Sequence, residues 1–170
     1  MMKAFKTTGL AYLWLTVIFL VLDQVTKQLI AQNFYLGESV NLLPFFDLTY
    51  ARNYGAAFSF LADQGGWQRW FFTFIAIAAS ILFVYWLAKE DKSNTRLNVA
   101  FSMMLSGALG NLIDRLIFGY VIDFLDFYWG SYHWPAFNVA DSAIFIGAAF
   151  MILDAFLSND DSKTTAGEKS

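Results

Sequence analysis

The stretch WQRWFFTFIAIAASILFVYWLA, residues 67–88, decides the fold of this chain. Arg69, close to its start, is the single charged residue within it. A helix that crosses the hydrocarbon core of a bilayer, roughly 30 Å thick, needs about 20 mainly apolar residues. The stretch therefore predicts a transmembrane helix.

Three further apolar runs have a similar length, at residues 9–31, 97–118 and 139–157. The whole chain is 58% hydrophobic and only 15% charged, which is too apolar for an ordinary soluble domain. We therefore predict a mainly α, integral membrane protein in which four transmembrane helices form one domain, residues 1–170. The polar tail, residues 158–170, is expected to be disordered.

Basic residues predict the orientation of the four helices. They lie before the first run, between the second and the third, and after the fourth: Lys3, Lys6, Lys89, Lys92, Arg96, Lys163 and Lys169. The positive-inside rule places these segments, and hence both termini, in the cytoplasm. Segments 32–66 and 119–138 then face the opposite compartment. The first run passes Asp23 and Lys27 without a small-residue cleavage site, so we expect it to stay as an anchor and not to be a cleaved signal peptide.

The two external segments differ in pattern. Residues 39–44 and 45–50 are rich in aromatic and β-branched residues and are broken by Pro44, which predicts short strands and a small sheet lying on the bundle. Residues 55–61 predict a short interfacial helix or lid that ends at Gly65 and Gly66. The second segment is strongly aromatic and is expected to rest in the headgroup region.

Charged and amide side chains gather at one end of the predicted helices. They are Asp23, Lys27, Asn111, Asp114, Arg115, Asp123 and Asp141. Charge near lipid is costly and usually marks a functional site. Asp23 and Lys27 are four residues apart, which predicts an ion pair on one helix face. Gly107, Gly110, Asn111 and Asp114 share one helical stripe, in which the two glycines also fit close helix packing.

Asp123 and Asp141 are the candidate catalytic residues. The chain has no cysteine, and His133 is its one histidine, so a thiolate or a histidine-rich metal centre is excluded. Two neighbouring carboxylates repel each other, so that one holds a proton while the other stays ionised, and such a pair hydrolyses peptides. The alternative stays open that Asp141 complements a helix dipole and that Asn138 is merely the N-cap. Asp47, Asp63 and Asp126 are rival partners but are assigned to aqueous loops.

Other residues have less specific interpretations. Asn53 and Gly55 predict a turn in which Asn53 could hold an extended substrate backbone. His133 is interpreted as an interfacial residue, and an all-carboxylate metal site is a weaker alternative. We expect neither a metal nor another cofactor, no nucleic-acid partner, and a monomer in contact with membrane lipid.

Five ordered motifs carry a resemblance to a known family. They are Asp23-Gln-Val-Thr-Lys27, Asn53-Tyr-Gly-Ala-Ala-Phe58, Gly107-Ala-Leu-Gly-Asn-Leu-Ile-Asp-Arg115, Val121-Ile-Asp-Phe124 and Phe137-Asn-Val-Ala-Asp141. Each motif is weak alone, but in this order on four predicted spans they are highly specific. From about residue 8 to 157 the chain closely resembles the lipoprotein signal peptidases, also called signal peptidase II.

The resemblance implies an aspartic endopeptidase of the bacterial inner membrane, with its site near the periplasmic face. Its substrates would be prolipoproteins carrying a diacylglyceryl-modified cysteine, before which the enzyme cleaves. By matched position Asp123 and Asp141 would be the catalytic dyad. Site-shaping or substrate-binding positions would be Asn53, Gly55, Gly107, Asn111, Arg115 and Asn138, and supporting polar positions Asp23, Lys27 and Asp114.

Two readings from other classes remain. Carboxylates within a membrane also mark ion pathways, so a small ion or proton transporter is one alternative. No charged path clearly continues from these carboxylates to the cytoplasmic side, which argues against transport. A non-catalytic membrane scaffold, whose polar cluster only locks helices together, is the other.

Overall fold

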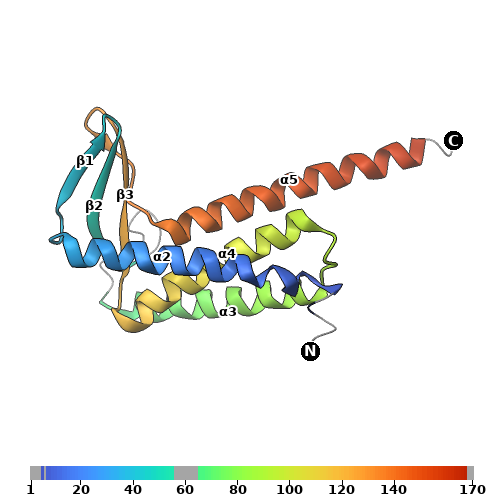
Figure 1. Cartoon of the computed structure of the whole chain (residues 1–170), viewed down its shortest axis with the longest axis horizontal. Coiled ribbons are helices and arrows are strands. Elements are labelled where there is room, and N and C mark those ends of the chain that lie inside the picture. The colour runs from blue at the N-terminus through green and yellow to red at the C-terminus, as the bar shows by residue number, and fades with distance from the viewer. Residues whose placement is uncertain (1–4, 6, 56–64, 168–170) are drawn as a thin grey trace.

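The computed structural model describes residue 5, residues 7–55 and residues 65–167, and side chains as far as residue 157. A short 3-10 helix, η1 (Gly9–Tyr12), leads into α2 (Leu13–Asn33). The other long helices are α3 (Trp67–Lys89), α4 (Thr95–Ile117) and α5 (Val139–Gly167). They run lengthwise through the molecule, with a small sheet across one end (Figure 1). The molecule is mainly helical, as the sequence predicts.

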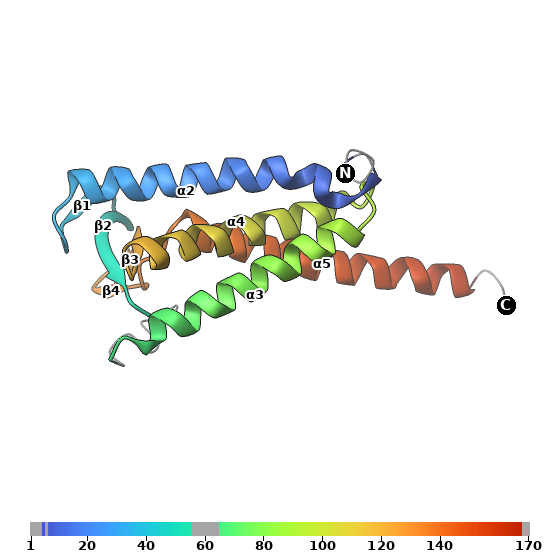
Figure 2. The ribbon, with the colours of Figure 1, turned by 90° about the horizontal axis from the view of Figure 1, so that it is seen from below.

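Three of the described helical segments are long and apolar enough to cross a membrane: Gly9–Asn33, Trp67–Lys89 and Val139–Leu157. These three agree with three of the four expected spans. The remaining helix, α4, is more polar because it lies inside the bundle, in contact with α2, α3 and α5 (Figure 2). Most of its side chains from Asn98 to Arg115 are buried. Polar residues are therefore tolerated on α4 because they face other helices.

The burial of α2 is the reverse of the pattern in a soluble protein. Its buried residues are largely polar and form one stripe: Thr16, Asp23, Lys27 and Ile30. Its exposed residues as far as Leu29 are apolar and include Trp14, Val17, Val21 and Val25. This pattern is expected of a helix that turns its apolar side to lipid and its polar stripe to a protein interior.

Glycines on α4 permit the close packing that the sequence indicates. A side chain at Gly107 would collide with the backbone carbonyl of Ala140, at the start of α5. A side chain at Gly110 would meet the carboxylate of Asp23. The two glycines therefore bring α2 and α5 against the same end of α4, where the polar residues gather.

The sheet consists of β1 (Ser39–Leu43), β2 (Phe46–Asn53), β3 (Val121–Trp129) and β4 (Tyr132–His133). Its strands are antiparallel and follow the order β1-β2-β3-β4. The hairpin across Pro44 agrees with the expected strands. The second external segment was expected to rest in the headgroup region and was not predicted to be extended, yet it supplies β3 and β4. The run Val121–Trp129 is rich in β-branched and aromatic residues, which was the available signal.

A cluster of buried apolar residues joins the sheet to the end of α2: Ile30, Tyr50, Ile122 and Phe124. In β3 the neighbours of Asp123 thus pack into this core, and β2 pairs Ala51 with Asp123. Strand pairing and this core together hold Asp123 beside the helix ends.

Two predicted segments do not match the described helices and strands. The predicted lid falls mostly on residues 56–64, outside the described residues. The helix α5 continues to Gly167, whereas we expected a disordered tail from residue 158. Extending an existing helix costs far less than nucleating one, so a polar segment can continue a helix that an apolar span has started.

Candidate active site

The polar residues converge where the C-terminal half of α2 and the last turns of α4 meet the first turn of α5, next to β3. Asp23 and Lys27 come from α2, Asn111 to Arg115 from α4, and Asp123 from β3. Asn138 and Asp141 come from the start of α5. Residues far apart in the sequence thus form one connected polar cluster.

Asn138 and Asp141 cap the start of α5 reciprocally. The side-chain oxygen of Asn138 accepts a hydrogen bond from the backbone nitrogen of Asp141 at 2.9 Å. A carboxylate oxygen of Asp141 accepts one from the backbone nitrogen of Asn138 at 3.2 Å. Asp23 adds a second cap, because its carboxylate accepts from the backbone nitrogen of Ala140 at 2.8 Å. The capping role expected of Asn138 is confirmed, and it fixes the position of the Asp141 carboxylate.

Asp123 is held by two amides. Asn138 Nδ2 donates to Asp123 Oδ1 at 2.7 Å, and Asn53 Nδ2 donates to Asp123 Oδ2 at 3.0 Å. Only 2% of Asp123 is exposed. Burial, reinforced by the nearby charge of Asp141, raises the pKa of Asp123 to about 7.

Asn138 therefore contacts both carboxylates, through its side chain to Asp123 and through its backbone to Asp141. The other oxygen of Asp141, Oδ1, accepts from Asn111 Nδ2 at 2.8 Å. One asparagine thus joins the two carboxylates, and the pKa of one of them, Asp123, is raised to about 7. These are the features of an acid–base pair.

Behind this pair lies a buried ionic triad. Lys27 Nζ is 2.9 Å from Asp23 Oδ2 and 3.1 Å from Asp114 Oδ2, and all three side chains are at most 1% exposed. The expected ion pair of Asp23 and Lys27 is confirmed. Asp114 also accepts from the backbone nitrogen of Ile122 at 3.1 Å, which links the triad to β3. Asp114 thus pairs with Lys27 and not with its sequence neighbour Arg115, because successive residues of a helix point in different directions.

Gln24 belongs to this cluster, and the sequence analysis missed it. Its amide donates to Asp23, to Asp114 and to the carbonyl of Gly110, at 3.1, 3.1 and 3.2 Å. Its position next to Asp23, as an uncharged polar residue inside an apolar run, was the one available signal.

Arg115 connects α4 to the end of β2. Its guanidinium donates to the carbonyl of Gly55 at 2.9 Å and to the carbonyl of Asn111 at 3.3 Å, and it lies over the ring of Phe72. Asn53 and Gly55 form the expected turn, in which the Gly55 nitrogen donates to Asn53 Oδ1 at 2.9 Å. Arg115 thus holds the backbone directly before residues 56–64.

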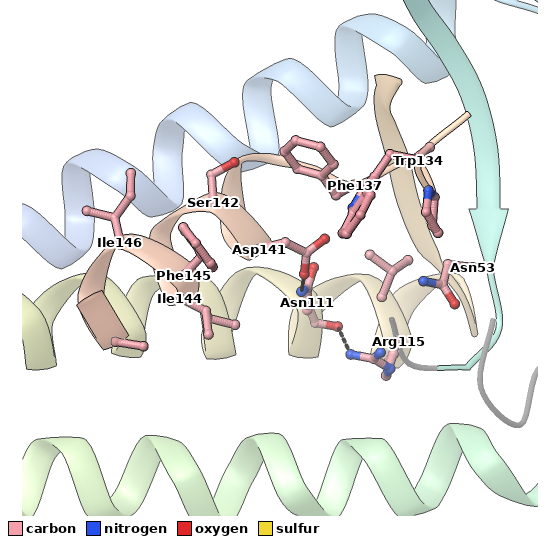
Figure 3. A pocket seen from close by; sticks show the side chains of 14 residues that line it. Asn53, Asn111, Arg115, Trp134, Phe137, Asp141, Ser142, Ile144, Phe145 and Ile146 are labelled. Carbon is pink, nitrogen blue, oxygen red and sulfur yellow. Dashed lines mark hydrogen bonds between the residues drawn. The ribbon is translucent and has the colours of Figure 1, made fainter. Parts of the chain in front are cut away.

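A pocket of about 860 Å³ opens beside these residues. Asn53, Asn111, Arg115 and Asp141 line its polar end. Figure 3 shows the rest of the wall, formed by aromatic residues that precede α5 and by apolar residues along α5: Trp134, Phe137, Ile144, Phe145 and Ile146. The pocket is therefore a long apolar space with one acidic, amide-rich end.

The rival carboxylates Asp47 and Asp126 were assigned to aqueous loops, and this was wrong. They lie opposite each other on β2 and β3, because the aromatic segments form strands. Ligand atoms of Asp47, Asp126 and His133 lie within 4.8 Å of one another. The carboxylates already accept from other groups, since Asn41 donates to Asp47 at 2.7 Å and Thr49 to Asp126 at 3.2 Å. Asp63 lies outside the described residues.

The profile of the family described as signal peptidase (SPase) II matches residues 15–157 of this chain. The chain belongs to the signal peptidase II family. It is an enzyme of that type, an aspartic peptidase.

Relatives of this signal peptidase II support the assignment over nearly the whole chain. A lipoprotein signal peptidase of Shewanella sediminis is 56% identical over 96% of this chain and 93% of its own length. One of Alteromonas mediterranea is 53% identical over 100% of this chain and 93% of its own. A solved bacterial membrane enzyme aligns with a TM-score of 0.79 and 37% identity, covering 90% of this chain and 91% of that one.

The pKa of Asp123 predicts a pH effect on the stability of this signal peptidase II. A carboxyl whose folded pKa is about 7, compared with an ordinary value of 3.8, binds its proton more tightly in the folded protein. Its contribution to stability is therefore complete below pH ~4 and is lost as the pH rises towards ~7. We expect the Asp123→Asn variant, which carries no titrating group there, to lose less thermal stability over this range than wild type. If the unfolding temperatures of the two proteins changed by the same amount from pH 4 to 8, the prediction would be contradicted.

Proposed function

We propose that this chain removes signal peptides from prolipoproteins by cleaving before a diacylglyceryl-modified cysteine, with Asp123 and Asp141 as its catalytic dyad. The observation that carries the proposal is the joining of both carboxylates by Asn138, with Asp141 at the polar end of a long apolar pocket. The relatives, which are lipoprotein signal peptidases, support the same substrate class.

The proposal includes a topology in the bacterial inner membrane. The helix α4 crosses as the fourth span, hidden from lipid by the other three, and both termini are cytoplasmic. The polar ends of α2 and α4 and the sheet then lie at the periplasmic face. The protein acts as a monomer and as one membrane domain. In a substrate whose apolar signal helix spans the membrane, the scissile bond that follows this helix lies at the same periplasmic face.

The pocket suits such a substrate chemically. Its apolar walls along α5 match a signal helix or the acyl chains of a lipidated cysteine. At its polar end, Asn53 and Arg115 can hold an extended peptide backbone while Asn111 and Asn138 hold the carboxylates. The sheet forms a cradle beside the polar cluster.

The chemistry proposed is the addition of water to a peptide carbonyl. One ionised carboxylate takes a proton from the water as its oxygen attacks the carbonyl carbon, and the protonated partner stabilises the carbonyl oxygen. The C–N bond then breaks, and the new amine takes a proton. Carboxylates and water suffice for each step, so the proposal requires no metal or other cofactor.

The experiment is cleavage of a purified prolipoprotein by purified enzyme in detergent. Two substrates that differ only in the diacylglyceryl group are compared, and the new N-terminus is identified by mass spectrometry. We expect the modified substrate to be cut before its cysteine and the unmodified one to be cut at a rate at least about 10²-fold lower, since binding energy of remote groups is used in the transition state. An inert wild-type enzyme would favour the transporter or scaffold interpretation, and equal cleavage of both substrates would refute the lipid requirement.

A further inference from the structure

The orientation of the Asn111 amide is fixed by its neighbours. Asn111 Oδ1 accepts hydrogen bonds from Lys27 Nζ at 2.9 Å and from Asn138 Nδ2 at 3.3 Å. Lysine has donors only, so the oxygen of Asn111 must face Lys27. Its nitrogen therefore faces Asp141 and donates to Oδ1 at 2.8 Å. The fully buried ammonium group of Lys27 thus determines that Asp141 contacts the nitrogen of Asn111 and not its oxygen.

We propose that Asn111, oriented by Lys27, is a positioning residue that makes Asp141 the ionised carboxylate that activates water and leaves the proton on Asp123. The inference rests on the proposed function and assigns a different role to each member of the dyad.

The surroundings of the two carboxylates also favour a negative charge on Asp141 and a proton on Asp123. Both carboxylates receive an amide donor on each oxygen, but Asp141 is partly exposed to the pocket and stands in the first turn of α5. A helix N-terminus favours a negative charge. Asp123 is 2% exposed on a strand, where an ionised carboxylate loses most of its hydration. Like-charge repulsion then prevents both from being ionised together.

Other charged groups around Asp141 come from three elements. Lys27 and Asp23 act on it from α2, Arg115 from α4, and Asp123 from β3. Asp23 and Asp114 offset the charge of Lys27, since both are within 3.1 Å of its nitrogen. Lys27 therefore acts on Asp141 through the fixed amide of Asn111 as well as through its remaining charge.

The assignment gives a balanced reaction. Asp141 accepts a proton from water while the water oxygen bonds to the carbonyl carbon, and Asp123 gives its proton to the carbonyl oxygen. When the C–N bond breaks, the proton on Asp141 goes to the leaving amine and the proton on the former carbonyl oxygen returns to Asp123. Both carboxyl groups end in their starting states.

Two isosteric substitutions test the assignment, because each places the same new carboxylate against one member of the dyad. Asn111→Asp puts an oxygen where an amide now stands 2.8 Å from Asp141, so Asp141 or the new group must hold a proton. Asn53→Asp puts an oxygen 3.0 Å from Asp123, whose own proton can bridge the pair. The measurement is the pH profile of kcat/KM for the lipidated substrate, with thermal unfolding of each variant as the folding control.

We expect Asn111→Asp to move the acid limb of the profile upward by roughly 2 pH units, because Asp141 ionises later beside a like charge. We expect Asn53→Asp to leave the acid limb in place and to move the alkaline limb upward, because Asp123 retains its proton longer. The reverse pattern, or limbs that do not move in folded variants, would overturn the assignment. Wild-type cleavage together with inactive Asp123→Asn and Asp141→Asn variants would show that the proposed function stands even if this assignment fails.

Discussion

Asp123→Asn and Asp141→Asn variants are each expected to lose prolipoprotein cleavage by a factor of about 10²–10⁴ or more, which is the usual contribution of a positioned acid or base. Asparagine keeps the size of aspartate but can neither accept the proton of water nor donate one to the carbonyl. Asn138 and Asn111 can still contact the new amide oxygens, so the fold should survive. The measurement is kcat/KM for the lipidated substrate at one protein concentration. It compares the wild type with variants that unfold at the same temperature under the assay conditions.

Asp126→Asn is the matched control for the dyad variants. Asp126 lies three residues along the same strand, β3, and so on the opposite face, where it contacts His133 and Thr49. The same change of charge at this position should leave cleavage within a few-fold of wild type. Full activity of either dyad variant would reject the dyad and favour the scaffold interpretation. An equal loss in Asp126→Asn would indicate that the substitutions act by disturbing the sheet.

The second large effect is expected for Lys27→Met. This change leaves Asp23 and Asp114 buried without their common cation, and removing one partner of a buried ion pair typically costs 3–5 kcal/mol, here about 4 kcal/mol. For a chain of this length we expect the unfolding temperature to fall by about 10 °C. Cleavage by the remaining folded protein should also fall, because Asn111 Oδ1 loses its lysine donor. Thermal unfolding in detergent and single-turnover cleavage measure the two effects separately.

Lys92→Met provides the comparison for this prediction. Lys92 is exposed in the turn between α3 and α4, and replacing an exposed charge typically changes stability by less than about 0.5 kcal/mol. The double variant Lys27→Met, Asp114→Asn should recover part of the loss, since it leaves one buried carboxylate fewer without a partner. An unchanged unfolding temperature for Lys27→Met would mean that the triad contributes little to stability.

Local patterns predicted the helices well. Apolar runs of about 20 residues set the span segments, since each such run must satisfy its own backbone hydrogen bonds as a helix in lipid. The spacing of Asp23 and Lys27 predicted their ion pair, because residues four apart share a helix face. Pro44 marked the break between β1 and β2. In each case the deciding interaction lies within a few residues.

Partners distant in the sequence were harder to predict. The aromatic stretch that holds β3 can lie in a headgroup region or pair as a strand, and only β2 decides between them. Asp126 was placed in a loop for the same reason. Gln24 went unnoticed because its partners on α4 are about 90 residues away. The polarity of α4 is explained by its central position, which the order of helices in the sequence does not reveal.

By itself, the sequence determined the class of protein, the helical segments and the residues available for chemistry. Hydrophobic length and helical periodicity are local properties, and the five ordered motifs restrict the family. Only the tertiary structure decided which carboxylate meets which amide: that Lys27 pairs with Asp114, that Asn111 turns its nitrogen to Asp141, and that Asn138 contacts both Asp123 and Asp141. These contacts depend on the close approach of α2, α4 and α5, which Gly107 and Gly110 allow. The glycines indicate close packing in the sequence, but they do not indicate which helices approach.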